Sequence, residues 1–237
     1  MPLIYYNYWT NDNYQKFIKE LSKLQEKEYL DFNKRLIFTK YKMIGIRIPE
    51  LRKITKEISK TNFRSFLDCK TEGIFEEIFI KGVLLSYIKD YNEFVSRLND
   101  FINLVDNWAI CDMCISGYKI INKHKDKFLN NIKEYLVSLE EFKIRIGIIF
   151  LLDYYLTEEY IDEVFNLLEN INYHSYYIDM AIAWLISIAF IKYQEKTLDY
   201  LEKTKLDKEI LRKTVQKIRD SKRVSKEVKD YVLKYKK

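Results

Sequence analysis

The near absence of glycine and proline constrains the fold of this chain more than any other sequence feature. Its 237 residues include only 5 Gly and 2 Pro. Tight hairpins, sandwich loops and Gly-rich phosphate loops all depend on these residue types. The 48% hydrophobic and 32% charged residues are typical of a folded protein with a sizeable core. We therefore expect helices almost throughout.

Apolar residues recur at helical spacing along most of the chain. From about Asn11, steps of three and four residues connect Tyr14, Phe17, Ile18, Leu21 and Leu24. Further helices are predicted at residues 73–89, 91–104, 106–122, 125–137, 140–156, 158–169, 173–193, 195–203, 207–220 and 225–236. No alternating strand pattern competes with them, and no Gly/Pro-rich linker divides them. The sequence thus predicts an all-α, solenoid-like array of antiparallel helix pairs with degenerate repeats, forming a single domain over residues 1–237.

The first ten residues differ from the rest because they are aromatic without a clear period. They include Tyr5, Tyr6, Tyr8 and Trp9. We interpret residues 1–10 as an N-terminal arm that either packs on the domain or contacts a ligand.

The clearest helix start follows Gly45. Pro49 suits the first helical turn, Glu50 suits its positive end, and an apolar stripe follows at Leu51, Ile54 and Ile58. The cations around this start are Arg47, Arg52, Lys53 and Lys56. They form either a phosphate-binding cluster beside exposed backbone amides or a solvated basic face.

A second basic region lies near the C-terminus. Leu211, Val215 and Ile218 supply the inward face of the helix predicted at 207–220. The cations that we single out as phosphate ligands there are Arg212, Lys213, Lys217, Arg219 and Arg223. Acidic residues such as Asp207 and Glu209 are interspersed, so a solvated helix surface is the alternative.

Charge and cysteine content indicate the setting in which the protein acts. The net charge of +6 points to a polyanionic partner only where the cations cluster. The 3 cysteines, Cys69, Cys111 and Cys114, occur without a signal-peptide pattern, so we expect a reducing, cytoplasmic location. The longest apolar run, residues 178–191, is interrupted by Asp179 and falls short of the roughly 20 residues that span a bilayer. We expect no membrane association.

Metal and histidine chemistry find little support in the sequence. His124 and His174 have no serine, cysteine or carboxylate partner at a recognisable spacing. Cys111 and Cys114 form a single C-x-x-C pattern inside a predicted helix, where small core residues are the better interpretation than a metal or redox pair. We expect neither a metal nor a cofactor.

Four polar or amphipathic residues in apolar helices need explanation. Trp108 and Asp112 are four residues apart, so a helix places them on one face. Arg145 lies in a run that is otherwise apolar except for Gly147, and burying an arginine without a partner costs several kcal/mol. Its partner is Asp112, Asp153 or a nucleic-acid phosphate. Trp184, flanked by alanines, is by itself best read as a core residue.

Taken together, these stretches resemble the HEAT-like-repeat alkylpurine DNA glycosylases of the AlkD type. The resemblance rests on the ordered set Gly45-Ile-Arg-Ile-Pro-Glu-Leu-Arg52, Trp108-x-x-x-Asp112, Arg145 within 144–148, Trp184 within 181–184, and Thr214-Val-Gln-Lys-Ile-Arg219. It covers about residues 15 to 225. It implies a C-shaped helical solenoid whose concave basic surface holds duplex DNA, and hydrolysis of the N-glycosidic bond of N3- and N7-alkylated purines without base flipping.

The resemblance also implies roles for individual residues. Asp112 would be the catalytic carboxylate, Arg145 a backbone-binding partner beside it, and Trp108 and Trp184 aromatic walls against the sugar of the lesion. The sequence departs from the family at the cleft tyrosine, because the corresponding position is Leu36 and the nearest tyrosine, Tyr41, is out of register. A non-catalytic protein that binds damaged or branched DNA is therefore the alternative function, and a protein-binding helical solenoid is a third. We expect a monomer.

Overall fold

The computed structural model describes residues 3–236, which form helices α1 to α14. Among these residues the only β-type pairing is an isolated bridge between Lys42 and Ile74. The predicted all-α class is confirmed. The chain separates into two compact units, Met1–Ile120 and Ile121–Lys237, and the single domain over 1–237 stays a prediction.

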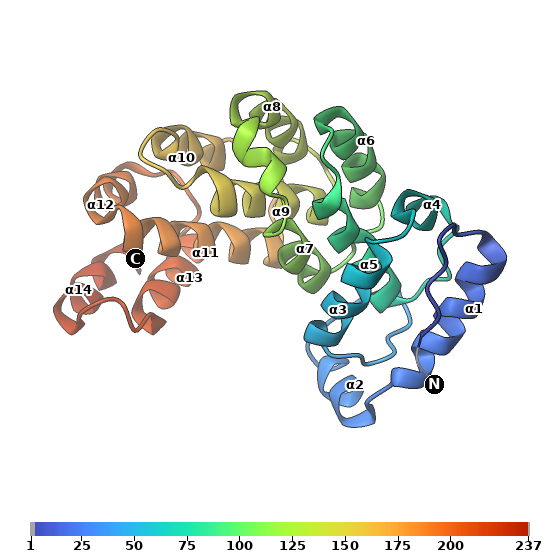
Figure 1. Ribbon diagram of the computed structural model, residues 1–237. Helices are drawn as coiled ribbons and strands as arrows, with labels where there is room; N and C mark the ends of the chain where they lie inside the picture. The colour runs from blue at the N-terminus through green and yellow to red at the C-terminus, as the bar shows by residue number, and fades with distance from the viewer. Residues whose placement is uncertain (1–2, 237) are drawn as a thin grey trace. The chain divides into compact units, whose positions relative to one another are not determined.

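In the first unit, three helices form a row in which α5 contacts both α3 and α7 (Figure 1). Short 3-10 turns extend α1 and α5 at Ser22–Leu24 and Leu85–Tyr87. The helices are α1 (Asn11–Leu21), α2 (Lys27–Asn33), α3 (Ile48–Ile58), α4 (Phe63–Asp68), α5 (Phe75–Leu84), α6 (Tyr91–Ile102) and α7 (Trp108–Ile115).

In the second unit, the long apolar helix α11 lies between α9 and α13 and contacts both (Figure 1). The helices are α8 (Lys125–Leu136), α9 (Glu141–Phe150), α10 (Ile161–Glu169), α11 (Tyr176–Lys192), α12 (Gln194–Lys203), α13 (Lys208–Asp220) and α14 (Lys226–Tyr231). A π-helical turn, Leu151–Tyr155, continues α9, and 3-10 turns occupy Lys119–Lys123 and Val232–Lys236.

Two short helices were not predicted, and one predicted helix is shorter than expected. Leu30 is the only buried residue of α2, so that helix has almost no apolar period. The six-residue α4 begins where the Asn62 side chain accepts a hydrogen bond from the backbone of Ser65. The helix predicted at 106–122 ends at Ile115, and a 3-10 turn follows at Lys119–Lys123. Between them the Tyr118 hydroxyl donates to the carbonyl of Gly82 at 2.9 Å.

The N-terminal arm packs through Trp9. Its indole is 2% exposed and lies edge-on to the rings of Phe17 and Phe66. The backbone N–H of Trp9 donates to Ser65 Oγ, and its indole N–H donates to Thr61 Oγ1, each at 2.9 Å. Of the two alternatives for the arm, packing therefore describes Trp9.

A buried carboxylate on α5 shapes the loop before α3. Glu76 is 1% exposed and accepts hydrogen bonds from the backbone N–H groups of Ile44, Gly45 and Ile46 at 2.9, 2.6 and 3.3 Å. Burial raises the pKa of Glu76, and the three N–H donors oppose that shift. Gly45 has φ +91°, and a Cβ there would lie 2.5 Å from Leu30 Cβ. Both the backbone conformation and the space require glycine.

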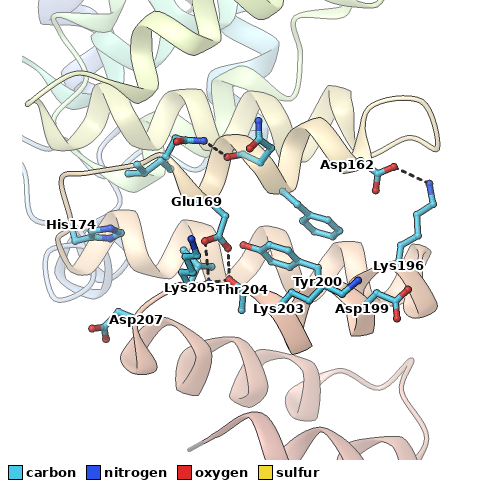
Figure 2. A pocket seen from close by; sticks show the side chains of 15 residues that line it. Asp162, Glu169, His174, Lys196, Asp199, Tyr200, Lys203, Thr204, Lys205 and Asp207 are labelled. Carbon is cyan, nitrogen blue, oxygen red and sulfur yellow. Dashed lines mark hydrogen bonds and ion pairs between the residues drawn. The ribbon is translucent and has the colours of Figure 1, made fainter.

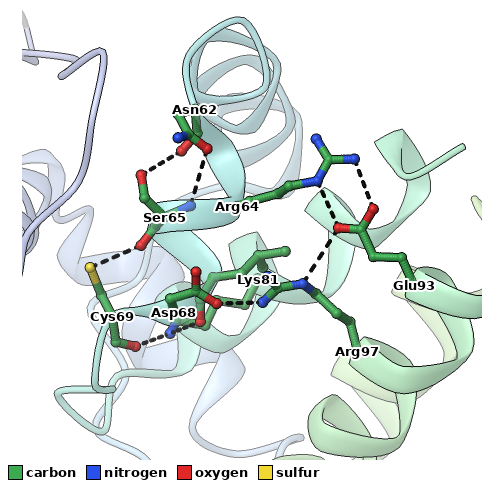
Figure 3. A network of polar contacts seen from close by, with 9 residues as sticks. Asn62, Arg64, Ser65, Asp68, Cys69, Lys81, Glu93 and Arg97 are labelled. Atoms are coloured by element: carbon green, nitrogen blue, oxygen red, sulfur yellow. Dashed lines mark hydrogen bonds and ion pairs between the residues drawn. The ribbon is translucent and has the colours of Figure 1, made fainter. Parts of the chain in front are cut away.

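Helices α4, α5 and α6 are joined by a polar network around Lys81 (Figure 3). Lys81 is 5% exposed and donates to the carbonyls of Leu67 and Cys69. Burial lowers the pKa of its ammonium group. Arg97 pairs with Asp68 at 2.6 Å, and Arg64 pairs with Glu93 at 2.7 Å. These contacts join α4 to α5 and to α6.

Candidate nucleic-acid interface

All predicted site residues lie on or directly beside helices of the two rows just described. In the first unit, Arg47 is the N-cap of α3, and α3 also carries Arg52 and Lys53, while α7 carries Trp108 and Asp112. In the second unit, α9 carries Arg145 and α11 carries Trp184. Helix α13 carries Arg212, Lys213, Lys217 and Arg219, with Arg223 just beyond its end. The candidates on α3 and α7 therefore belong to the first unit, and those on or beside α9, α11 and α13 belong to the second.

Helix α7 begins at Trp108 because Asn107 caps it. The Asn107 side chain, 1% exposed, accepts a hydrogen bond from the backbone of Ile110 at 3.0 Å. Trp108 is half-buried, and its indole N–H donates to the carbonyl of Leu36 at 3.2 Å. Asp112 lies one turn further along α7 and is partly exposed. The helix therefore places the hydrogen-bonded indole of Trp108 and the partly exposed residue Asp112 on one face.

Asp106 holds the segment that contacts Trp108, a role that the sequence did not suggest. Its carboxylate accepts hydrogen bonds from the Thr39 hydroxyl at 2.8 Å and from the backbone N–H of Lys40 at 2.7 Å. Next to it, the Tyr41 hydroxyl donates to the carbonyl of Leu104 at 2.7 Å. Burial raises the pKa of Tyr41 to about 12, and the charge of Asp106 adds to the shift. The segment that carries Leu36 is thus anchored to the start of α7.

The buried guanidinium of Arg145 has a partner that the sequence did not predict. Arg145 is 6% exposed and donates from Nη1 to the carbonyl of Tyr177 at 2.6 Å. The ring of Tyr177 packs against Phe142, with centroids 5.4 Å apart. Arg145 therefore joins α9 to the first turn of α11, and part of its desolvation is offset by a backbone acceptor.

Trp184 is half-buried on α11. Its neighbours Ala181 and Ala183 are fully buried, so the helix packs closely on that side. The indole keeps part of its surface accessible, unlike the residues of α11 that form the core.

Most of the predicted phosphate ligands are already paired within the protein. The pairs are Arg47 with Glu26 at 2.8 Å, Lys53 with Glu50 at 3.1 Å, Arg212 with Glu209 at 3.0 Å and Lys213 with Asp179 at 3.2 Å. Arg52 donates to the carbonyl of Met113 at 2.9 Å and so connects α3 to α7. The pairs of Arg47, Lys53 and Arg212 are exposed, and exposed ion pairs contribute only about 0–1 kcal/mol, so these three can be exchanged for phosphate contacts. The Lys213–Asp179 pair is mostly buried.

A cationic cluster that was not predicted lies between α2 and α3. Residues 34–42 read Lys-Arg-Leu-Ile-Phe-Thr-Lys-Tyr-Lys and contain no acidic residue. Lys34, Arg35, Lys40 and Lys42 are exposed, and none forms an ion pair with another residue in the described part of the chain. The absence of acidic residues from this run was the sequence signal for it.

A hollow of about 940 Å³ lies between α10, α12 and the loop before α13 (Figure 2). Glu169 accepts hydrogen bonds there from the Thr204 hydroxyl and from the backbone of Lys205, and the rings of Phe165 and Tyr200 are stacked with centroids 4.2 Å apart. Four carboxylates and three lysines line it together: Asp162, Glu169, Asp199, Asp207, Lys196, Lys203 and Lys205. With its charges mixed and partly paired, this hollow does not select an anionic ligand.

The cysteines lie in the core, as expected for Cys111 and Cys114. Both of these thiols are 1% exposed and Cys69 is 7% exposed. His174 pairs through Nδ1 with Asp179 at 3.0 Å. Across residues 3–236, no three His, Cys, Asp or Glu side chains are grouped as metal ligands. Within the same residues, no helix has the length and apolar character needed to cross a membrane.

Comparison with known families matches the model described as DNA alkylation repair enzyme to residues 17–218. The chain belongs to this family. The match starts within α1 and ends within α13, so it includes Trp108, Asp112, Arg145 and Trp184. It confirms the resemblance drawn from the ordered motifs and indicates DNA repair, with DNA as the partner of this DNA alkylation repair family member. No curated protein matched the chain.

Proposed function

We propose that the protein is a DNA glycosylase that hydrolyses the N-glycosidic bond of cationic N3- and N7-alkylated purines in duplex DNA. The observation that carries this proposal is the face of α7. There Asp112, a partly exposed residue, lies one turn from Trp108, whose indole N–H donates to the Leu36 carbonyl. Membership of the DNA alkylation repair enzyme family supplies the substrate class.

The chemistry of such a lesion suits a site built on one carboxylate. An alkylated purine already carries positive charge, so it departs as a neutral base without a general acid. Positive charge then develops on the deoxyribose, where a nearby carboxylate stabilises it and orients the attacking water. An indole face beside the sugar adds cation–π attraction of about 0.5–2 kcal/mol. In this proposal Asp112 is the catalytic residue and Trp108 is the aromatic wall beside it.

We propose lesion-contacting roles for Arg145 and Trp184 of the second unit as well. Arg145 binds the DNA backbone near the lesion, and Trp184 is the second aromatic wall. In this proposal the cations of α3 and α13 bind phosphates of the duplex DNA. The protein acts as a monomer without a metal or cofactor, in the cytoplasm.

Base release tests this function directly. Full-length protein is incubated with duplex DNA that carries one 7-methylguanine, and free base is measured over time. We expect release by the wild-type protein and a loss of at least about 100-fold in the Asp112→Asn variant, with duplex binding unchanged. Wild-type release no faster than that of Asp112→Asn would overturn the proposal.

A non-catalytic DNA-binding protein is the second candidate, and one observation favours it. Leu36 occupies the position of the family's cleft tyrosine, and the hydroxyl of the nearest tyrosine, Tyr41, is bound to the Leu104 carbonyl. Salt-dependent binding of damaged or branched DNA without base release would support this function. No affinity for DNA at low salt would instead support a protein-binding solenoid.

A further inference from the structure

We propose that a pocket beside α2 binds one unpaired nucleotide of a DNA strand. The α2 pocket has a volume of about 780 Å³ and is lined by Gln25, Leu30, Lys34, Ile37, Phe38, Thr39, Tyr41, Lys42 and Met43. The inference rests on the proposed function, because it takes DNA as the partner and assigns a second place where the DNA contacts the protein.

The walls of the α2 pocket suit a planar base. Leu30, Ile37 and Met43 are 7%, 8% and 8% exposed and provide apolar surface. Phe38 is 71% exposed, so its ring is accessible to a ligand. The Tyr41 ring is fixed because its hydroxyl donates to the Leu104 carbonyl. Aromatic rings beside apolar surface are how proteins bind unpaired bases, since every base has a face that stacks.

The charges around the α2 pocket suit a phosphate. Lys34 and Lys42 line it, and no acidic residue does. Neither lysine forms an ion pair with any side chain in residues 3–236. The hollow between α10 and α12 differs in this respect, because four carboxylates line it together with its lysines. Aromatic side chains together with two lysines that form no ion pair favour a ligand that is both planar and anionic, as a nucleotide is.

The α2 pocket is held in shape without a ligand. Asp106 accepts hydrogen bonds from the Thr39 hydroxyl and the Lys40 backbone. The backbone of Lys42 donates to Gly73 and accepts from Phe75, each at 3.0 Å. A wall fixed at both ends loses little conformational freedom when a ligand binds.

The same segment connects the α2 pocket to the candidate site. The carbonyl of Leu36, two residues before Phe38, accepts the indole N–H of Trp108 at 3.2 Å. A strand that lies against Trp108 therefore passes close to the pocket. We infer that the pocket takes a nucleotide that is unpaired near the lesion, which gives the protein a preference for locally opened duplexes.

Binding to undamaged DNA tests the proposal, because no base is then released. Full-length protein is titrated at fixed salt with a blunt duplex and with the same duplex containing one unpaired nucleotide. We expect the second DNA to bind about tenfold more tightly. An unpaired abasic residue at the same place retains the backbone and removes the base, so the preference should disappear. Equal affinity for the first two DNAs, or a preference that persists with the abasic residue, would overturn the proposal.

Two variants assign the effect to the pocket. Phe38→Ala should remove the preference while leaving affinity for the blunt duplex unchanged. The matched control is Phe32→Ala on α2, where the side chain is 52% exposed but does not line the pocket. Both side chains are solvent-exposed, so both variants should fold, and circular dichroism checks this. A preference that is unchanged in Phe38→Ala, or lost equally in Phe32→Ala, would contradict the assignment.

The outcome is separable from that of the glycosylase assay. Phe38→Ala should still release 7-methylguanine from a fully paired duplex. If the wild-type protein shows the preference but releases no base, the proposal for the α2 pocket stands and the proposed glycosylase function is wrong. If the protein releases base without the preference, the glycosylase function stands and the proposal for the α2 pocket is wrong.

Discussion

At the scale of single residues, fixed polar side chains prepare the candidate site. In the proposed mechanism Asp112 acts beside the indole of Trp108, so that indole must be held in place. The Trp108 indole N–H donates to the carbonyl of Leu36. Asp106 in turn fixes Thr39 and Lys40 within the segment that carries Leu36. The spacing of Trp108 and Asp112 was readable from the sequence because helical geometry is local. The role of Asp106 was not, because its partners lie more than sixty residues away.

Replacing Asp106 should therefore lower both stability and activity. Asp106→Ala leaves the Thr39 hydroxyl and the Lys40 N–H without their acceptor, and we expect a loss of about 1–3 kcal/mol in the free energy of unfolding. Base release should fall as well, because Trp108 loses its support. Urea unfolding and the 7-methylguanine assay measure the two effects. The exposed Asp100→Ala is the control, and equal stability of the two variants would contradict this role.

At the scale of helices, boundaries that depend on local chemistry were predicted and those that depend on distant contacts were not. Pro49 and Glu50 marked the start of α3, which begins at Ile48. Just beyond the early end of α7 at Ile115, the Tyr118 hydroxyl reaches the carbonyl of Gly82 on α5. The loop before α3 likewise depends on Glu76, which lies thirty or more residues further along the chain. No local pattern reports such partners.

Gly45 gives a test of that loop. Gly45→Ala introduces a side chain at φ +91° and a Cβ at 2.5 Å from Leu30 Cβ. Gly73→Ala is the matched control, because its φ is +77° but nothing lies within 4 Å of the added Cβ. The left-handed backbone alone costs roughly 1–2 kcal/mol, and we expect Gly45→Ala to cost at least about 1 kcal/mol more than that. Urea unfolding of both variants measures the difference, and equal losses would show that the contact with Leu30 is not limiting.

At the scale of the whole molecule, the ordered motifs identified the family, and local patterns found helices on which the site residues lie. Helical spacing relates residues of one helix to each other, so it does not relate Asp112 on α7 to Arg145 on α9. The positions of cations that are available to bind phosphate were also only partly predictable from the sequence. Four predicted phosphate ligands pair with nearby carboxylates, whereas the cations of residues 34–42 were not predicted as phosphate ligands. Clusters of cations are informative chiefly where acidic neighbours are absent.

Salt dependence tests whether the predicted cations of α13 contact DNA. Each phosphate contact contributes about 0.9 to the slope of log affinity against log salt concentration. Arg223→Ala removes an exposed cation just beyond α13, and we expect the slope to decrease by about that amount. Lys70→Ala removes an exposed cation between α4 and α5 and should leave the slope unchanged. Equal slopes for all three proteins would contradict a phosphate contact at Arg223.

The central claim is that Asp112 stabilises the sugar cation formed when an already cationic base departs. The most direct measurement compares single-turnover release of 7-methylguanine and of neutral hypoxanthine from otherwise identical duplexes, by wild-type protein and by Asp112→Asn. We predict that the wild type releases 7-methylguanine alone, and that Asp112→Asn binds both duplexes but releases neither base at a comparable rate. Release of hypoxanthine as fast as 7-methylguanine, or undiminished release by Asp112→Asn, would contradict the account.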